Sequence, residues 1–206
     1  MLKPTCAVTE DTDNLALLLH YSEPLAEPLY MSSANRTISI NTMKLLLPPP
    51  IVNILLFLHL QSGCDTTSRP KGIGKLTALS KAGQLQDVAE AFMNEDTTRE
   101  DIITNGEKAM LLLFGSTKET LNQARAEQYH RRVAKAFVSP DKFLPTSDAA
   151  AQNSLRVYHQ LQAWLGRELP PDQWGWEMTS IGYKPITMTC PAAPEKLLKI
   201  IKCRCQ

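Results

Sequence analysis

The sequence predicts an α/β fold that is predominantly helical. Segments that favour β-strands are found near the N-terminus, at 5–9, 29–32 and 37–40. The rest of the chain is dominated by longer segments with helical periodicity, separated by proline, glycine and polar breaks. With 206 residues, the chain is long enough to bury a core as one domain, or as one domain with an appendage.

Charge and cysteine content narrow the class of protein. Lys and Arg total 22 while Asp and Glu total 21, so any basic surface that attracts nucleic acid must be local. Five cysteines without regular spacing argue against a disulfide scaffold and indicate a reducing compartment. No signal-peptide pattern opens the chain, and the most apolar span, 45–60, is broken by prolines and too short to cross a bilayer. We therefore expect a soluble, intracellular protein with no membrane partner.

The N-terminal third is expected to alternate short strands with short helices. A helix or a strand is predicted at 15–20, with Asp11 as a candidate helix cap. A short helix is predicted to end at Leu47, because three prolines follow it. Residues 51–60 are apolar on nearly every face, which is typical of a helix buried in an α/β core. His59 lies in this run, and we expect it to be a buried, hydrogen-bonded residue without a catalytic role.

Helical periodicity continues through most of the remaining chain. Gly83 is expected to separate two helices, and Gly115 is expected to end a third. The helix that begins at residue 119 has a basic side, which we interpret as a solvated face. The helical segments predicted after residue 75 are 76–93, 102–114, 119–137, 148–166 and 195–201.

The stretch 61–78 carries the pattern that indicates a function. It leaves the apolar run through Gly63-Cys64-Asp65 and reaches Gly72-Ile73-Gly74 just before a lysine-containing helix. This layout places a carboxylate at the end of a buried element, followed by a glycine hairpin whose free backbone amides suit a phosphate. A carboxylate for a metal ion beside amides for a nucleic-acid backbone indicates phosphodiester chemistry.

Each residue of the hairpin has an expected part in contacting nucleic acid. Gly72 and Gly74 allow a close backbone approach that side chains would block. Lys71 and Lys75 flank the hairpin and would neutralise phosphates, which positions a duplex without reading its sequence. The predicted nucleic-acid-binding residues are therefore Lys71, Gly72, Ile73, Gly74 and Lys75. For the tetrapeptide Gly-Ile-Gly-Lys alone, an ordinary tight turn into a helix is the alternative interpretation.

A nucleoside triphosphate is excluded as a ligand of this segment. The phosphate loop of nucleotide-binding proteins needs Gly-x4-Gly-Lys followed by Ser or Thr. Here Arg69 stands at the position of the first glycine, and Leu76 follows Lys75. The hairpin is thus expected to contact a polynucleotide backbone and not ATP or GTP.

Two motifs resemble those of flap-endonuclease-type nucleases, a branch of the PIN-like fold. Gly63-Cys64-Asp65, a seven-residue step and Gly72-Ile73-Gly74-Lys75-x-x-Ala78 are similar to the helix–two-turn–helix signature of that family. Upstream, Thr9-Glu10-Asp11-Thr12-Asp13 is similar to the family's T-E-D-x-D segment. The chain resembles still more closely a group of transposon-associated animal proteins that have a G-C-D-T-T-S core and a Cys-rich tail.

The resemblance implies a metal site and a substrate. In the family the corresponding aspartates bind divalent metal, so Asp11, Asp13 and Asp65 are the expected metal ligands and catalytic residues, with Mg²⁺ or Mn²⁺ as cofactor. The glycine hairpin would hold DNA, branched or flapped, and a nuclear location follows from that substrate. From the residues alone, helix capping by Asp11 is the alternative to a metal role.

The resemblance also implies that part of a nuclease domain is missing. Only ten residues precede Asp11, whereas the similar nucleases draw further carboxylates from an N-terminal half. We therefore expect residues 1–115 to be the C-terminal part of a PIN-like nuclease domain, with an incomplete parallel sheet and the helix–two-turn–helix at 63–82. Residues 116–206 would form a helical extension with a Pro/Trp-rich tail and a terminal Cys-x-Cys. A further protein segment would supply the missing carboxylates.

Three functions are compatible with these expectations. The first is a metal-dependent structure-selective nuclease. The second is a catalytically inactive nucleic-acid-binding remnant of a transposon-associated protein, and the third is a helical protein-interaction module. For the isolated chain, binding without efficient turnover is preferred to catalysis, whereas for the intact protein a nuclease is preferred.

Overall fold

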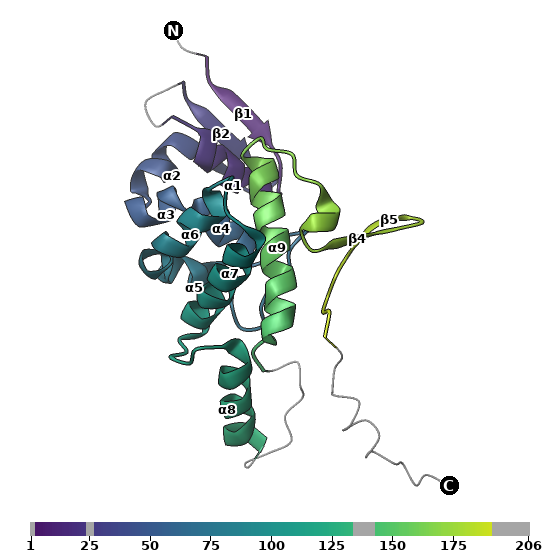
Figure 1. The fold of residues 1–206 in the computed structure, drawn as a ribbon. Coiled ribbons are helices and arrows are strands. Elements are labelled where there is room, and N and C mark those ends of the chain that lie inside the picture. The colour runs from purple at the N-terminus through teal and green to yellow at the C-terminus, as the bar shows by residue number, and fades with distance from the viewer. Residues whose placement is uncertain (1–2, 24–26, 134–142, 191–206) are drawn as a thin grey trace, which may run out of the picture.

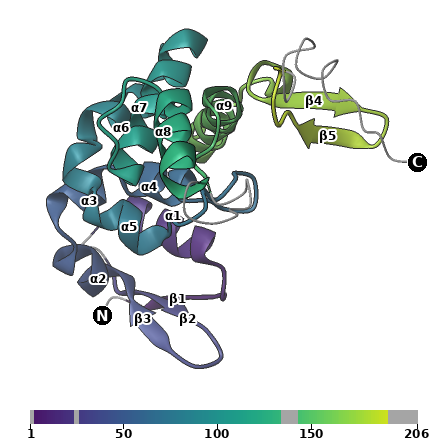
Figure 2. The same ribbon diagram turned by 90° about the horizontal axis from the view of Figure 1, so that it is seen from below.

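The computed structural model describes residues 3–23, 27–133 and 143–190. Helices surround the core, while two small sheets lie at the periphery (Figures 1 and 2). This arrangement confirms the predicted α/β class with a predominance of helix. In chain order the elements are β1 (Thr5–Val8), α1 (Thr12–Tyr21), β2 (Leu29–Ser32), β3 (Thr37–Ser39), α2 (Ile40–Leu46), α3 (Pro49–Asn53), α4 (Leu55–Gln61), α5 (Lys75–Ser80), η1 (Ala82–Gln84), α6 (Gln86–Met93), α7 (Arg99–Phe114), α8 (Leu121–Val133), α9 (Ser147–Trp164), η3 (Pro171–Gln173), β4 (Trp176–Thr179) and β5 (Gly182–Pro185).

The N-terminal sheet has the order β1-β2-β3, and all three strands lie where they were predicted. β1 pairs with β2 in parallel, and α1 supplies the crossover between them. The pairing of β2 with β3 is antiparallel, so the expected parallel sheet is in fact mixed. The reason is the short connection at 33–36, closed by a hydrogen bond from Ser33 N to Arg36 O of 2.9 Å, because so short a loop can only reverse the chain.

The apolar run after the prolines forms two helices and not the single buried helix that was predicted. α3 begins on prolines, which suit the first turn of a helix, and it has no buried residue. At Ile54 the backbone leaves the helical region, with φ −121° and ψ 23°. α4 then enters the core with six of its seven residues buried. The break thus separates a surface turn from the buried helix.

The main core is built around α9, which packs against α4, α6 and α7. Phe57 of α4 and Phe92 of α6 lie with ring centroids 4.9 Å apart, and Phe92 meets Tyr158 of α9 at 6.4 Å. Leu155 and Leu161 of α9 are fully buried in the same cluster. Although α9 belongs to the extension expected from residue 116, it therefore contributes to the core that also holds α1 and α4.

The later helices follow the predicted pattern. Gly83 lies in the 3₁₀ turn between α5 and α6, and Gly115 ends α7 in the left-handed conformation with φ 65°. The predicted end of the helix from 119 to 137, the helix at 195–201 and the terminal Cys-x-Cys lie outside the described residues. Within the described ranges, no helix combines the length and apolar character needed to cross a bilayer.

Candidate functional site

The turn that carries Asp65 requires a glycine at its start. Gly63 follows α4 with φ 100°, and a Cβ at this position would lie 2.6 Å from Cβ of Arg69. Both the backbone conformation and the close approach exclude a side chain here. Asp65 comes two residues later and is exposed. The Gly-Cys-Asp pattern thus reflects a tight return of the chain past the end of α4.

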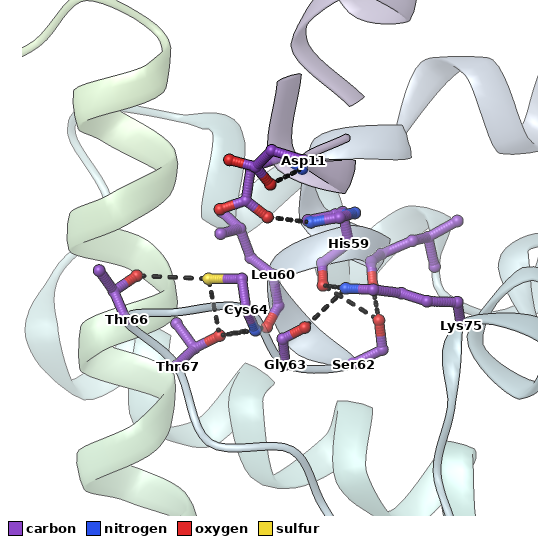
Figure 3. Close-up of polar contacts among 11 residues, drawn as sticks. Asp11, His59, Leu60, Ser62, Gly63, Cys64, Thr66, Thr67 and Lys75 are labelled. Carbon is purple, nitrogen blue, oxygen red and sulfur yellow. Dashed lines mark hydrogen bonds and ion pairs between the residues drawn. The ribbon is translucent and has the colours of Figure 1, made fainter. Parts of the chain in front are cut away.

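Hydrogen bonds from Thr67 hold this turn to α4. The Thr67 hydroxyl, which is buried, donates to Leu60 O at 2.7 Å and accepts from Cys64 N at 3.1 Å (Figure 3). One residue further on, Ser68 N donates to Oδ1 of Asn153 on α9 at 2.8 Å. The hydroxyl of Thr67 therefore has both its donor and its acceptor role inside the protein.

Lys75 joins the end of α4 to the start of α5. Figure 3 shows its ammonium group between His59 and Gly63, and it donates to the backbone carbonyl of each at 2.6 Å. Burial lowers the pKa of Lys75 from its ordinary value. The predicted phosphate contact of this lysine stays a prediction, because in this structure its ammonium group faces protein carbonyls.

Asp13 is linked to the same place through His59. Its Oδ1 lies 2.6 Å from Nε2 of His59, and the histidine is only 8% exposed. Burial lowers the pKa of His59 by more than the hydrogen bond to Asp13 raises it, so the neutral imidazole donates Nε2–H to the carboxylate. The prediction of a buried, hydrogen-bonded histidine is confirmed, but its link to Asp13 was not expected.

Asp11 occupies the cap position of α1. Its Oδ1 accepts a hydrogen bond from Asp13 N at 2.9 Å, which is the capping role weighed against metal binding. The side chain is exposed, and its charge influences the pKa of His59. The T-E-D-x-D segment therefore lies beside the end of α4, from which the turn of Asp65 begins.

The hydrogen bonds of Asp11 and Asp13 occupy one carboxylate oxygen of each residue. Asp11 and Asp13 each use Oδ1 in the hydrogen bonds above and retain Oδ2. Two carboxylates with water are a normal complement for Mg²⁺, so the donor chemistry fits. Within the described ranges, which include Asp65, no three His, Cys, Asp or Glu side chains gather into a group that could hold a metal ion. The three-aspartate site stays a prediction.

The glycine hairpin presents backbone at the surface. Gly72 has φ 85° and is exposed, and a Cβ there would meet nothing within 4 Å. The side chain of Ile73 is buried in the core, and its amide donates to Pro70 O at 3.0 Å. Gly74 is the cap residue of α5, and within the described ranges no side chain caps that helix. The hairpin is thus anchored by isoleucine and open at Gly72, beside the exposed Lys71.

Sequence reasoning missed the residues that join distant parts of this site. His59 was expected to have no role, yet it connects α1 to α4 through Asp13. Asn153 lies 85 residues from Ser68 and fixes the approach to the hairpin. No local pattern marks such contacts, because they depend on how α1 and α9 pack against α4.

Comparisons of this chain with protein-family models, with curated proteins and with solved structures find no match.

Proposed function

We propose that this chain binds the phosphodiester backbone of branched or flapped DNA and contributes to a metal-dependent, structure-selective nuclease. The observation that carries the proposal is a chain of contacts between the two acidic motifs. His59 bonds to Asp13 through its side chain and to Lys75 through its carbonyl, and Lys75 in turn bonds to Gly63. Segments about fifty residues apart in sequence are thereby held around one end of α4.

In this proposal Asp11, Asp13 and Asp65 would hold Mg²⁺ or Mn²⁺. Such an ion activates water and stabilises charge on a phosphate when it is bound. The protein's own contribution is orientation. The hydrogen bond from His59 keeps one oxygen of Asp13 directed at α4, which leaves its other oxygen as the available ligand.

The hairpin would supply the grip on DNA. The open surface at Gly72 admits a phosphate close to the backbone, and Lys71 adds positive charge next to it. Contacts of this kind set the register of a duplex and do not read bases. Selectivity for a branched structure would therefore come from shape.

Binding without hydrolysis is the second candidate, and the contacts of the aspartates favour it. Asp11 already caps α1 and Asp13 already pairs with His59, so both have structural roles that need no metal. A chain with these contacts can keep its fold and its hairpin after losing catalysis.

Cleavage of a flapped DNA duplex in Mg²⁺ or Mn²⁺ tests the first candidate. We compare the wild type with Asp65→Asn, and use Asp87→Asn, an exposed aspartate in the first turn of α6, as a matched control. Cleavage that disappears only in Asp65→Asn supports a nuclease. Equal background activity in all three proteins leaves binding as the function.

Binding is tested separately by titrating DNA at rising salt. Lys71→Ala should weaken binding and make the salt dependence shallower, because one fewer phosphate is neutralised. Lys184→Ala is the control, since Lys184 lies on β5 and pairs with Glu177 at 2.9 Å. If Lys71→Ala has no more effect than the control, the hairpin is not the contact and a helical protein-interaction module becomes the better hypothesis.

A further inference from the structure

A cavity of about 360 Å³ lies next to the hairpin, between the segment that leads into it, α8 and the start of α9. Its described lining contains four cationic side chains, Arg69, Lys71, Arg125 and Arg156, and no acidic one. Several cationic side chains around one cavity create a positive local potential, which attracts an anion. The composition of the lining thus indicates an anionic ligand.

Arg156 is the buried cation of this lining. It is 4% exposed, and its guanidinium donates to the carbonyls of Gly175 at 3.3 Å and Ile186 at 2.6 Å. Within the described ranges these acceptors and the amide oxygen of Asn153 are its hydrogen-bond partners, and none has a formal charge. Burial lowers its pKa, but a guanidinium remains charged in a protein. A buried cation without a counter-charge is unfavourable, and a bound anion would compensate it.

Arg125 of α8 contributes a second guanidinium to the lining. It lies 5.5 Å from the centre of the Phe143 ring and donates to Leu144 O. Stacking on the ring and bonding to a carbonyl both restrict this side chain. Its charge is therefore held at the cavity by the fold.

Asn153 supplies an unpaired donor in the same lining. Its Oδ1 accepts from Ser68 N at 2.8 Å and from Nη2 of Arg156 at 3.5 Å. Because both neighbours are donors, the orientation of the amide is determined. Its Nδ2 is buried and has no hydrogen-bond partner within the described ranges, although the residue is only 4% exposed. Buried donors of this kind are rare, and one in a cationic cavity matches an acceptor on a ligand.

We propose that this cavity binds the terminal phosphate of a nucleic-acid strand together with its nucleotide. Phosphate oxygens accept both from guanidinium groups and from an amide N–H. The volume is in the range of small-ligand sites and exceeds the needs of an inorganic ion, while Phe143 offers an apolar wall. Lys71 belongs to both the hairpin and the cavity, so a strand held by the hairpin ends within reach. The inference thus rests on the proposed function and adds the strand end to it.

Calorimetric titration with a 5′-phosphorylated thymidine dinucleotide tests the inference. The same dinucleotide without its 5′-phosphate and thymidine monophosphate are the comparison ligands. We expect the phosphorylated dinucleotide to bind most tightly. Asn153→Asp keeps an oxygen for Ser68 N and Arg156 but replaces the donor with a negative charge, so binding should weaken at least about tenfold.

Two further variants separate charge from folding. Arg69→Gln, at an exposed position, should weaken binding and lower the melting temperature only slightly, because the variant also loses the long bond from Arg69 Nε to Ile73 O of 3.4 Å. Arg36→Gln, in the loop between β2 and β3, should leave binding unchanged. The inference is overturned if both dinucleotides bind equally or if Asn153→Asp binds as the wild type does. Equal affinity for thymidine monophosphate assigns the cavity to free nucleotides and overturns the strand-end assignment.

The same experiments separate this inference from the proposed function. If the wild type does not cleave flapped DNA but binds the dinucleotide in a way that depends on Asn153, only the nuclease proposal is overturned. Flap cleavage that depends on Asp65 and is insensitive to Asn153→Asp, without dinucleotide binding, overturns only the strand-end site.

Discussion

The ammonium group of Lys75 and the imidazole of His59 each lie where two segments of the chain meet. The ammonium group of Lys75 bonds to two carbonyls at the end of α4, and the imidazole of His59 bonds to Asp13 on α1. Both groups are partly or largely buried, so each bond replaces water that the polar atoms would otherwise need. At the scale of the residue, the site is therefore stabilised by side chains that the proposed DNA contact does not require.

Replacing Lys75 tests its structural role. Lys75→Met leaves the carbonyls of His59 and Gly63 without their donor, so the free energy of unfolding should fall by about 1–3 kcal/mol. Urea denaturation measures the change. Lys81→Met is a matched control and should stay within about 0.5 kcal/mol of the wild type. Equal stability of the two variants would show that the lysine bridge is not required for folding.

The protonation of His59 makes stability depend on pH. Its pKa in the folded protein is lowered below 6.5 by burial, so between that lowered value and about 6.5 the unfolded chain binds more protons than the folded one. Stability should therefore be complete above about pH 6.5 and decrease as the pH falls below it. Urea denaturation at pH 7.5, 6.5 and 5.5 measures this decrease.

The variant His59→Gln measures how much of this pH dependence of stability comes from His59. Burial also lowers the pKa of His20 and of His159, so His59→Gln should reduce the decrease between pH 6.5 and 5.5 without abolishing it. If stability instead rises as the pH falls, the contact with Asp13 is an ion pair that raises the pKa, and the neutral imidazole assigned here is wrong.

The packing of α7 on α9 depends on one small residue. Gly106 lies in the middle of α7, and a Cβ there would fall 1.9 Å from Oγ and 2.4 Å from Cβ of Ser154. The two helices thus approach so closely that only glycine fits. Because α9 also carries Asn153, this approach positions both the segment before the hairpin and the cationic cavity.

Enlarging Gly106 should separate these helices. Gly106→Ala is expected to lower the free energy of unfolding by about 1–3 kcal/mol, since overpacking must displace Ser154 or the helix axis. Gly83→Ala, where a Cβ would meet nothing within 4 Å, is the control and should be neutral or slightly stabilising. Combining Gly106→Ala with Ser154→Gly should restore part of the loss. Thermal melting measures these differences. Equal melting temperatures of Gly106→Ala and Gly83→Ala would contradict the close approach of α7 to α9.

At the scale of the whole molecule, the core crosses the expected boundary at residue 115. Leu155, Tyr158 and Leu161 of α9 are buried among side chains of α4 and α6. The segment that leads into β4 and β5 is also attached to α9. The ring of Trp174 lies 4.5 Å from that of Tyr158, and Arg156 donates a hydrogen bond to Gly175 O. Removing α9 would expose the apolar faces of α4, α6 and α7 together.

A shortened chain tests this interdependence. A chain that ends at residue 115 should show no cooperative thermal transition, because it loses the helix that closes the core. A chain that ends at residue 190 retains every described element and should unfold in one transition. Circular dichroism during heating distinguishes them. A cooperative transition in the shorter chain would show that residues 1–115 form an autonomous domain.

The sequence by itself determined the order and type of most elements, but it did not predict the strands β4 and β5 in the Pro/Trp-rich segment. Strand preferences predicted the three N-terminal strands, and Gly115 marked the end of α7. These signals are local, because a cap or an alternation acts within a few residues. The break at Ile54 was not predicted, since it depends on which part of the apolar run enters the core.

Only the tertiary structure decided which side chains meet. The bond from His59 to Asp13, the bond from Ser68 to Asn153 and the four cations around one cavity join residues far apart in the chain. Pairing over such separations follows from helix packing and leaves no periodic trace in the sequence. The acidic and glycine motifs were visible beforehand, whereas the contacts that bring them to one end of α4 required the fold.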